Sequence, residues 1–346
     1  MRGHRKDGWL IVGGAARYMV ASGARGATRL SMTAKRILIT GAAGFVGAVL
    51  TRRVLELGHE VHVVTKSTSP SWRLADVVRD LRVHQGDLTD EAGVQRLVEA
   101  SRPEIVYHLA THGAYPFQTN ADGIIQTNIL GTWNLLKALA RTDYEVFVNT
   151  GSSSEYGFKE YAMRETDLLE PNSYYSVAKC AQTLLCQHVA KTERKPITTF
   201  RLFSVFGPYE EPSRLLPTLI RLCLEGKDLT LVDPSTARDF VYVDDVVDAY
   251  LRTDKLTGLC GEVVNIGTGV QRSLEQVVEA VLAETKADVQ CHWGAMPARI
   301  WDATTWVGDC TKSQRLLGWR STTSLADGIA RTVDWMRERH DRRERA

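Results

Sequence analysis

Short apolar runs alternate with amphipathic stretches along the first two thirds of this 346-residue chain. The runs have the length and composition of buried strands, and the stretches between them have helical periodicity. The expected strands lie at 36–40, 60–65, 81–85, 104–110, 145–150 and 197–203, and the expected helices at about 44–57, 91–100, 124–140 and 176–191. This alternation predicts right-handed βαβ units and a parallel sheet covered by helices on both faces. Such a sheet binds its ligands at the carboxyl ends of its strands.

The regular alternation ends after residue 203, where turn-rich stretches such as FGPYEEPSR and VDPSTARD separate shorter elements. We therefore expect an α/β fold, a doubly wound parallel sheet of the Rossmann type with a smaller C-terminal substrate-binding domain. The nucleotide-binding part is expected at 34–203 plus about 237–257, with the strand at 239–243 and its helix returning to the main sheet. The substrate-binding part is expected at about 204–236 and 258–340. Residues 1–33 are expected to be a disordered or non-native extension, because Met32 stands just ahead of the first strand.

Composition argues against several classes of protein. Lys and Arg number 43 against 41 Asp and Glu, so no strong global charge is present to attract nucleic acid or an anionic membrane. The apolar run at 9–20 is too short for a membrane span and is interrupted by Arg17. Six cysteines and nine histidines are scattered without metal-ligand spacing, so we expect reduced thiols, a cytoplasmic protein and no metal.

A glycine turn joins the first expected strand to the first expected helix in the stretch ILITGAAGFVGAVL. Gly41, Gly44 and Gly47 allow a tight turn, a close approach of the backbone to a pyrophosphate, and tight packing of helix on strand. The start of the helix then offers free amide donors to a phosphate. The spacing is GxxGxxG, and its place between strand and helix favours a dinucleotide site over a purely structural turn.

The end of the second strand bears on which dinucleotide binds. An acid usually stands there to bind the ribose 2′-hydroxyl, but this chain has Thr65, followed by Lys66 and Arg73. A cationic loop suits a 2′-phosphate, so NADP(H) is favoured and NAD(H) remains possible; alternatively, the two cations are solvated loop charges. Asp87 is expected either to accept from the adenine amino group or to cap the next helix.

Two tyrosines precede a lysine in the stretch SYYSVAK. On a helix, residues four apart share a face, so Tyr175 lies beside Lys179, whereas Tyr174 has only Ala178 at that spacing. A nearby ammonium lowers the pKa of a phenol and suits it to proton transfer. Ser152 would lie at the carboxyl end of the fifth strand, where its hydroxyl can hold a substrate oxygen beside the tyrosine.

Taken together, residues 35–335 resemble the extended short-chain dehydrogenase/reductases that modify nucleotide sugars. The matching stretches include TGAAGFVG, GDLTD, HLA, TNILGTWNLL, GSSSEYG, YSVAK, RLFSVFGP, ARDFVYVDDVV, NIGTG and LGW. The resemblance implies a catalytic triad of Ser152, Tyr175 and Lys179, with Lys179 also bonded to the nicotinamide ribose, and a structural or proton-relay role for Asn128. The further cofactor contacts that it implies are Phe45, Val46, Leu88, Leu109, Ala110 and Thr111.

The resemblance also implies how the substrate is held. Arg238 and Arg299 match the arginines with which the family binds a nucleotide diphosphate, although either can instead pair locally with Asp239 or Asp302. Ser153 and Ser204 are further expected substrate contacts, and Ser204 stands where many relatives have asparagine. The aromatic-rich segment that contains Trp306 is expected either to stack on the substrate or to pack a small domain. Many relatives are homodimers, so we expect a homodimer.

Three chemistries are open to such a chain: sugar 4,6-dehydration, epimerisation and ketone reduction. Dehydratases of the family have a carboxylic acid two residues before the tyrosine of YG, whereas this chain has Ser153 and Ser154 there, with Glu155 one place late. Reduction of a nucleotide-linked 4-keto-6-deoxyhexose is the first prediction, because GSSSEYG resembles the stretch of such reductases. A 4-epimerase with tightly bound NAD is the alternative, followed by the dehydratase and by a catalytically silent dinucleotide-binding module.

Overall fold

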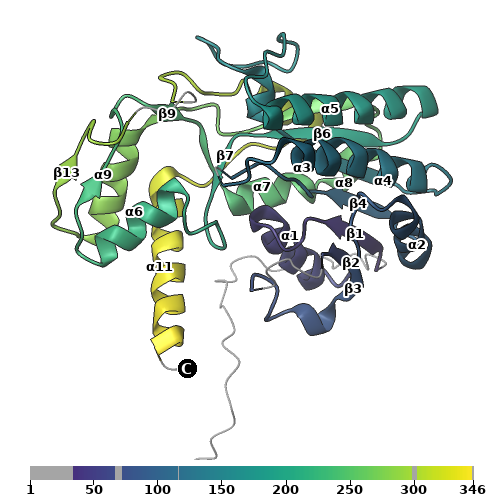
Figure 1. Cartoon of the computed structure of the whole chain (residues 1–346), viewed down its shortest axis with the longest axis horizontal. Coiled ribbons are helices and arrows are strands. Elements are labelled where there is room, and N and C mark those ends of the chain that lie inside the picture. The colour runs from purple at the N-terminus through teal and green to yellow at the C-terminus, as the bar shows by residue number, and fades with distance from the viewer. Residues whose placement is uncertain (1–33, 67–71, 116, 298–301, 345–346) are drawn as a thin grey trace, which may run out of the picture. The chain divides into compact units, whose positions relative to one another are not determined.

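Seven parallel strands form the main sheet, in the order β11-β6-β5-β4-β1-β2-β3 (Figure 1). Their bounds are β1 Arg36–Thr40, β2 Glu60–Thr65, β3 Arg82–Gln85, β4 Ile105–His108, β5 Val146–Ser152, β6 Ile197–Leu202 and β11 Glu262–Ile266. Six of the strands have the order of the doubly wound dinucleotide-binding fold, and β11 extends it beyond β6. The predicted Rossmann-type fold is confirmed.

The structure is a computed structural model, and it describes residues 34–66, 72–115, 117–297 and 302–344. Residues 34–346 belong to one compact unit. The predicted extension 1–33 and the predicted phosphate ligand Arg299 lie outside the described residues. Within the described ranges, no helix has the length and apolarity needed to cross a membrane.

Helices cover both faces of the sheet (Figure 1). Those between the strands are α1 Phe45–Glu56, η1 Val78–Asp80, α2 Glu91–Ser101, α3 Ala121–Ile125, η2 Gln126–Leu130, α4 Gly131–Leu139, η3 Ser153–Tyr156 and α5 Tyr174–Glu193. Alternate residues of β1 belong to different buried clusters: Ile37 and Ile39 pack in the cluster that includes α1, and Leu38 packs in the cluster that includes α2, α4 and α5. The period of two in a strand therefore sends each apolar side chain to the helices of one face.

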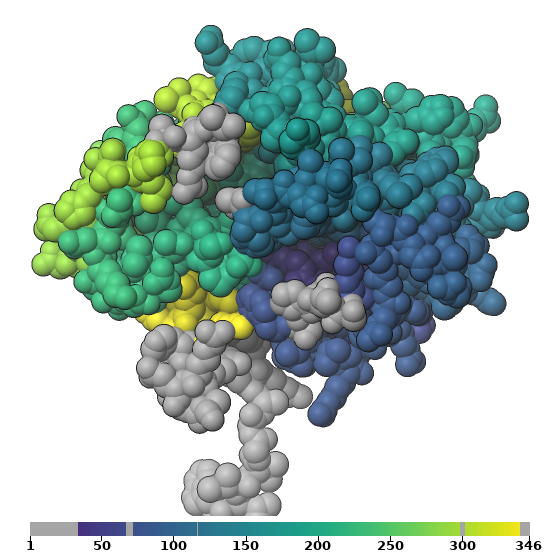
Figure 2. All heavy atoms as spheres, viewed as in Figure 1, coloured from purple at the N-terminus to yellow at the C-terminus, as the bar shows by residue number. Residues whose placement is uncertain are grey.

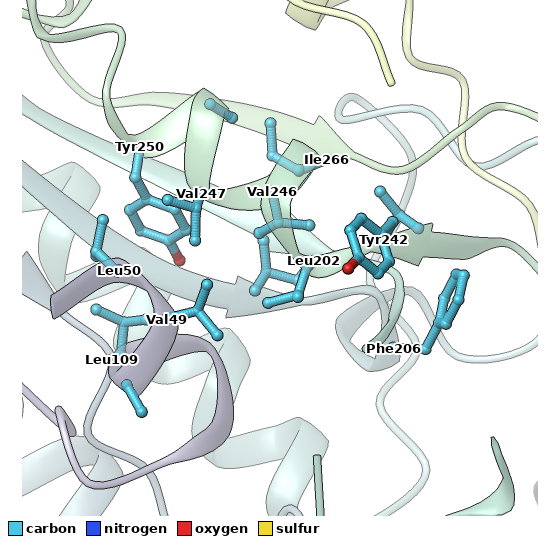
Figure 3. Close-up of a cluster of buried hydrophobic side chains, with 14 of the residues drawn as sticks. Val49, Leu50, Leu109, Leu202, Phe206, Tyr242, Val246, Val247, Tyr250 and Ile266 are labelled. Carbon is cyan, nitrogen blue, oxygen red and sulfur yellow. The ribbon is translucent and has the colours of Figure 1, made fainter. Parts of the chain in front are cut away.

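The larger core cluster joins the sheet to later parts of the chain. Figure 3 shows Val49 and Leu50 of α1 facing Val246, Val247 and Tyr250 of the helix α7 Val243–Tyr250 across one face of the sheet. The same cluster continues into the C-terminal helices α6 Leu215–Leu224, α9 Leu274–Thr285 and α11 Leu325–Glu344, and the remaining helices are α8 Thr253–Leu256 and α10 Thr311–Leu317. The C-terminal elements therefore share a hydrophobic core with the nucleotide-binding part.

Three two-stranded pairs lie outside the main sheet. They are β7 Ser204–Phe206 with β10 Phe240–Tyr242, β8 Leu229–Thr230 with β13 Cys291–His292, and β9 Ala237–Arg238 with β12 Arg272–Ser273. The expectation that the strand at 239–243 returns to the main sheet was wrong. The place beside β6 is taken by β11, whose Ile266 pairs with Leu202, so β10 pairs with β7 instead.

Candidate active site

The glycine turn between β1 and α1 has no room for side chains at two positions. Gly41 has φ +74°, and a Cβ there would lie 2.5 Å from the Ala110 nitrogen and from the Leu109 carbonyl carbon. A Cβ on Gly47 would lie 2.2 Å from the Gly41 oxygen. The turn therefore packs directly on α1 and on the carboxyl end of β4, as the spacing of the glycines predicted.

Helix α1 begins at this turn without a side-chain cap. Gly44 is its N-cap residue, the first turn contains no acid, and Phe45 and Val46 are its first residues. The first amides of a helix have no partner within the helix, and together with the helix dipole they form a binding site for an anion. In Figure 2, purple atoms from the start of the described chain are visible in a recess between blue and teal segments.

The carboxyl end of β4 is held against the turn by a buried histidine. The Thr132 hydroxyl donates to the Asn128 carbonyl (2.6 Å), so it can only accept from His108 Nε2 (2.8 Å). His108 therefore carries its proton on Nε2, and its Nδ1 accepts from the Thr40 hydroxyl (2.7 Å). Burial, with the charge of Lys179, lowers the pKa of His108 to about 3, so the ring is neutral. The sequence analysis did not identify His108 as a functional candidate, although it is the first residue of the HLA stretch at 108–110.

Asn128 lies in the π-helical turn η2, which interrupts the predicted helix 124–140. Its side chain is fully buried and bonds with the loop after β4: Oδ1 accepts from the Thr111 hydroxyl (3.1 Å) and the His112 amide (2.9 Å), and Nδ2 donates to the His112 carbonyl (2.8 Å). A π-turn places one side chain out of helical register, which is why such turns are common at functional sites. These bonds support the structural role that the resemblance implied.

The cations at the end of β2 are each paired with a carboxylate. Lys66 Nζ lies 2.8 Å from Asp87 Oδ2, just beyond Thr65. Arg73 is buried, donates to the Tyr209 carbonyl (2.7 Å) and pairs with Glu211 (3.0 Å). The expectation that Arg73 serves a 2′-phosphate is corrected by these contacts, because its guanidinium is committed to the loop after β7.

Asp87 and Leu88 follow β3 as expected. Burial opposes ionisation of Asp87, but hydrogen bonds from Lys66 and Thr89 outweigh it and lower its pKa. Asp87 accepts from the Thr89 amide (3.0 Å) and therefore organises the turn that leads into α2, whose N-cap is Asp90. Leu88 is buried, and its carbonyl accepts from Asn134 of α4 (2.9 Å).

The predicted triad gathers at the carboxyl end of β5. Ser152 is the last residue of β5, and Tyr175 lies in the first turn of α5. Burial raises the pKa of Tyr175 above its ordinary value, whereas hydrogen bonds with the side chains of Ser152 and Thr111 lower it. The side chains of Ser152 and Thr111 are therefore close enough to the Tyr175 phenol to lower its pKa, at the end of β5 and in the loop after β4.

Lys179 lies one turn further along α5, almost completely buried. Its ammonium donates to the Thr150 carbonyl and to Gln182 Oε1. Burial lowers the pKa of Lys179 to about 8, although the charge of Glu155 opposes that shift. The expectation that Lys179 depresses the pKa of Tyr175 is corrected, because burial prevails at the phenol and its pKa is raised.

Tyr174, the neighbouring tyrosine, is 65% exposed. It therefore lies on the outer surface of α5, and it neither packs in the core nor faces Ser152. The choice of Tyr175 over Tyr174 agrees with this geometry.

Ser153 and Arg238 are linked through Trp306. The indole Nε1 of Trp306 donates to the Ser153 hydroxyl (3.1 Å), and the Arg238 guanidinium lies 5.1 Å from the centre of the indole ring. Arg238 also donates to the Ala237 carbonyl (2.6 Å). Trp306 is buried, which agrees with the hypothesis that the aromatic-rich segment around it packs a small domain.

Arg214 is a functional candidate that the sequence reading missed. It is the N-cap residue of α6, is partly exposed, and is close enough to both Tyr175 and Arg238 for its charge to lower the pKa of each. Arg214 is therefore near both the phenol and the predicted diphosphate ligand. The available signal was an arginine directly before an apolar helix, in PSRLLP.

Ser204 and Asp239 lie beside this region. Ser204 begins β7 and donates its amide to the Asp239 carbonyl (2.9 Å). The Asp239 carboxylate accepts from the amides of Thr268 (2.8 Å), Gly269 (3.0 Å) and Gly308 (3.3 Å). The Asp239 carboxylate is therefore bonded to these loops. Burial lowers the pKa of Arg238, and the nearby charge of Asp302 opposes that shift.

The arrangement suits a dinucleotide with a reactive ring near Tyr175. The tight glycine turn, which carries no side chains at Gly41, Gly44 and Gly47, together with the uncapped start of α1, fits the close approach of a pyrophosphate to backbone amides. The carboxyl ends of β4 and β5 then bring Thr111, Ser152 and Tyr175 beside the same ligand. In the described part of the chain, no cluster of three or more His, Cys, Asp or Glu is arranged to hold a metal ion.

The sequence profile of the NAD dependent epimerase/dehydratase family matches residues 37–267. The chain belongs to this family. Among its relatives, the dTDP-glucose 4,6-dehydratase of Streptomyces griseus is 31% identical over 312 residues, which cover 86% of this chain and 93% of that protein. The UDP-glucose 4-epimerase of Mycolicibacterium smegmatis is 29% identical over 325 residues, which cover 88% and 99%.

Solved structures of family members have the same fold as this chain. The UDP-glucose 4-epimerase of Thermotoga maritima with UDP-glucose superposes with a TM-score of 0.81 at 28% identity and covers 88% of this chain and 99% of that one. The UDP-glucuronic acid 4-epimerase of Bacillus cereus, solved with UDP-glucuronic acid and NAD, gives a TM-score of 0.78 at 26% identity and covers 87% and 99%. The chain is thus a member of a family of NAD-dependent enzymes that act on nucleotide sugars, and the predicted resemblance is confirmed.

Proposed function

We propose that this protein is an NAD-dependent epimerase of a nucleoside-diphosphate sugar that inverts the configuration at C4. The observation that carries the proposal is that Ser152 and Tyr175 lie together at the carboxyl end of β5, whereas Glu155, the acid of the same stretch, is buried and paired with Arg201. A hydroxyl pair can remove and return one proton at a sugar oxygen, which is what epimerisation by oxidation and reduction requires.

The state of Glu155 argues against dehydration. Elimination of water across C5 and C6 needs a general acid for the leaving hydroxyl, and the two positions that supply it in dehydratases are Ser153 and Ser154. Glu155 is fully buried and pairs with Arg201 (2.8 Å). A carboxylate with both oxygens engaged inside the protein does not reach a substrate.

The contacts around β2 favour NAD over NADP. Lys66 and Arg73, the two cations that suggested a 2′-phosphate site, are paired with Asp87 and Glu211. A 2′-phosphate placed there would meet two carboxylates as well as two cations. The Bacillus cereus relative was solved with NAD, which agrees with this assignment.

Tyr175, Ser152 and Lys179 have different roles in the proposed reaction. A nicotinamide cofactor bound at the glycine turn would supply reversible hydride transfer to and from the sugar carbon. Tyr175, as its phenolate, takes the proton of the sugar hydroxyl and gives it back after the sugar has turned over, while Ser152 bonds to the same oxygen and stabilises the charge that develops there. Lys179 lies in the adjacent turn of α5 and remains a buried cation when protonated.

Two arginines bind the diphosphate in this proposal. Burial lowers the pKa of Arg238, and Arg214 is close enough for its charge to lower that pKa further; a guanidinium pair matches the oxygens of a diphosphate. The C-terminal segments 204–236 and 258–340 are proposed as the substrate-binding part. Arg299 remains a proposed third ligand from the resemblance alone.

A second copy of the chain is the proposed partner. Helix α5 lies beside α3, η2 and α4 (Figure 1). These four elements expose large apolar side chains, namely Ile125, Leu130, Trp133, Val177 and Leu184. Pairing of this face with the same face of another copy would remove these side chains from water. This supports the homodimer that the family resemblance suggested.

The second candidate is reduction of a nucleotide-linked 4-keto-6-deoxyhexose, which was the first prediction from the sequence. The stretch GSSSEYG, which resembles that of such reductases, favours it. The reductase uses the same Tyr175 to donate a proton to the C4 oxygen. It differs in consuming one reduced cofactor for each turnover.

The test begins with the nucleotide that the purified protein releases on denaturation. The epimerase predicts NAD in a near one-to-one ratio and conversion of UDP-glucose, UDP-glucuronic acid or dTDP-glucose to its 4-epimer, followed by NMR. Tyr175→Phe should lower turnover by about 10²- to 10⁴-fold with NAD still bound, and Tyr174→Phe should leave turnover unchanged. Protein that is empty and consumes NADPH with a 4-keto sugar supports the reductase instead, and full activity of Tyr175→Phe would overturn both proposals.

A further inference from the structure

A buried ion pair lies directly behind the proposed triad. Glu155 of η3 is fully buried, Arg201 of β6 is 3% exposed, and Arg201 Nε donates to Glu155 Oε2 at 2.8 Å. The Arg201 guanidinium also lies 4.6 Å from the centre of the Tyr156 ring, and its Nη1 has no hydrogen-bond partner. Burying two charges costs more than their attraction returns unless every polar atom is satisfied. A contribution to stability alone therefore does not account for this pair.

The other oxygen of the carboxylate holds the proposed catalytic serine. Glu155 Oε1 accepts from the Ser152 amide at 2.8 Å, and the Ser152 hydroxyl accepts from the Ser154 amide at 3.1 Å, which together form a capping box. The capping box sets the backbone of Ser152 at the end of β5. The Ser152 side chain is also close enough to Tyr175 to lower the pKa of its phenol.

The neighbours leave the carboxylate little freedom to move. A Cβ on Gly151 would lie 2.7 Å from Glu155 Oε1, so only glycine leaves room there for the carboxylate. On the far side, the Cys180 thiol donates to the Glu155 carbonyl (3.6 Å). Glu155 is thus fixed by β5, β6 and α5 at once.

The charge of Glu155 acts on both other members of the triad. It raises the pKa of Lys179, against the effect of burial, and it adds to the effect of burial in raising the pKa of Tyr175. The other titratable or charged groups that face this cluster from the surrounding elements are His108 on β4, Tyr156 on η3, Glu165 in the following loop, Cys180 and Cys186 on α5, Arg201 on β6 and Arg214 at α6.

We propose that Glu155 is a positioning residue of the triad, which holds Ser152 through its backbone amide and supplies the fixed negative charge that sets the pH range in which Tyr175 and Lys179 act. Arg201 holds the carboxylate in that place and offsets its charge. This inference rests on the proposed function, because it assigns a role within the proposed triad.

The test replaces the charge and keeps the shape. Glu155→Gln retains an oxygen for the Ser152 amide but leaves Arg201 buried without a partner, so it is made alongside the double variant Glu155→Gln/Arg201→Gln, in which two neutral amides can bond to each other. Loss of the negative charge favours the phenolate of Tyr175 and the neutral amine of Lys179. Both limbs of the pH profile of kcat should therefore move to lower pH by about one unit.

A second readout does not depend on turnover. NMR of isotope-labelled tyrosine, assigned with Tyr175→Phe, should show the Tyr175 phenol ionising at a pH lower by about one unit in Glu155→Gln and by a smaller amount in the double variant, which also loses the positive charge of Arg201. The control is Asp245→Asn, which removes another buried carboxylate, one that bonds with Ser321, Thr322 and Thr323 away from the triad. This variant should lower the melting temperature without moving the pH profile.

The outcomes separate this inference from the proposed function. Suppose that Tyr175→Phe is inactive, and that the Glu155 variants lose activity without a change in the pH profile of kcat or in the pH at which Tyr175 ionises. Glu155 then has only a structural role, so this inference fails while the proposed function stands. If Tyr175→Phe is fully active, the proposed function fails. A shift of the profile and of the titration in the double variant supports the inference even where the single variant does not fold.

Discussion

Replacing Gly41 by alanine gives a sharp test of the close approach between the glycine turn and β4. Gly41 has φ +74°, and its new Cβ would lie 2.5 Å from the Ala110 nitrogen, 2.5 Å from the Leu109 carbonyl carbon and 2.7 Å from the Leu109 oxygen. All three atoms belong to the backbone, so no side chain can rotate away to relieve the overlap. Relief requires the end of β4 to move away from the turn.

Gly58 provides a matched control. It has φ +82°, and nothing lies within 4 Å of the Cβ that alanine would add. Gly58→Ala therefore carries only the cost of a left-handed conformation, about 1 to 2 kcal/mol, which lowers the melting temperature of a folded unit of this size by about 2 to 3 °C. Gly41→Ala carries the same cost plus overpacking of about 2 to 3 kcal/mol, for a decrease of about 5 to 7 °C.

The two variants should also differ in cofactor content. Gly41→Ala displaces the end of β4 from the cradle and should purify with little or no NAD, whereas Gly58→Ala should retain the wild-type amount. The assay combines thermal unfolding with chromatography of the nucleotide released on denaturation. Equal melting temperatures and equal NAD content in the two variants would refute the close approach and the assignment of this turn as the pyrophosphate cradle.

Three further predictions concern side chains whose surroundings are known only from the structure. Arg73→Ala breaks the contact with Glu211 and should lower the free energy of unfolding by about 2 kcal/mol. Calorimetric titration should show an unchanged ratio of NAD affinity to NADP affinity. A selective loss of NADP affinity would instead show that Arg73 binds a 2′-phosphate. Burial raises the pKa of Glu210 from 4.5 to about 8, so the folded state holds a proton that the unfolded state has lost between these values, and stability falls as pH rises through this window. Glu210→Gln should remove that slope in denaturant titrations made across the window, and an unchanged slope would contradict the assignment. Leu184→Glu places a charge on the exposed face of α5 and should convert a dimer to a monomer in sedimentation velocity, whereas a wild-type monomer would refute the proposed interface.

Local patterns were enough to predict the sheet and the identity of the proposed catalytic hydroxyls. The glycine turn, the position of Ser152 at the end of a strand and the helical spacing of Tyr175 depend on neighbours within a few residues. The same reasoning chose Tyr175 over Tyr174, which the structure leaves 65% exposed. It failed for the strand at 239–243, because a segment further along the chain, β11, pairs with β6 and places Ile266 opposite Leu202, whereas β10 pairs with β7.

The sequence by itself therefore determined the fold class, the family and the residues that meet at the carboxyl ends of the strands, since strand and helix periodicity and glycine spacing act over short distances. Only the tertiary structure decided the partners of the charged side chains. Arg73 pairs with Glu211, and Glu155 pairs with Arg201. Lys179 donates hydrogen bonds to Thr150 and Gln182. The state of a buried charge depends on how deeply it is buried and on which opposite charge or acceptor lies within a few ångströms. Those neighbours come from segments far apart in the chain, so they exist only once the sheet and its helices have packed.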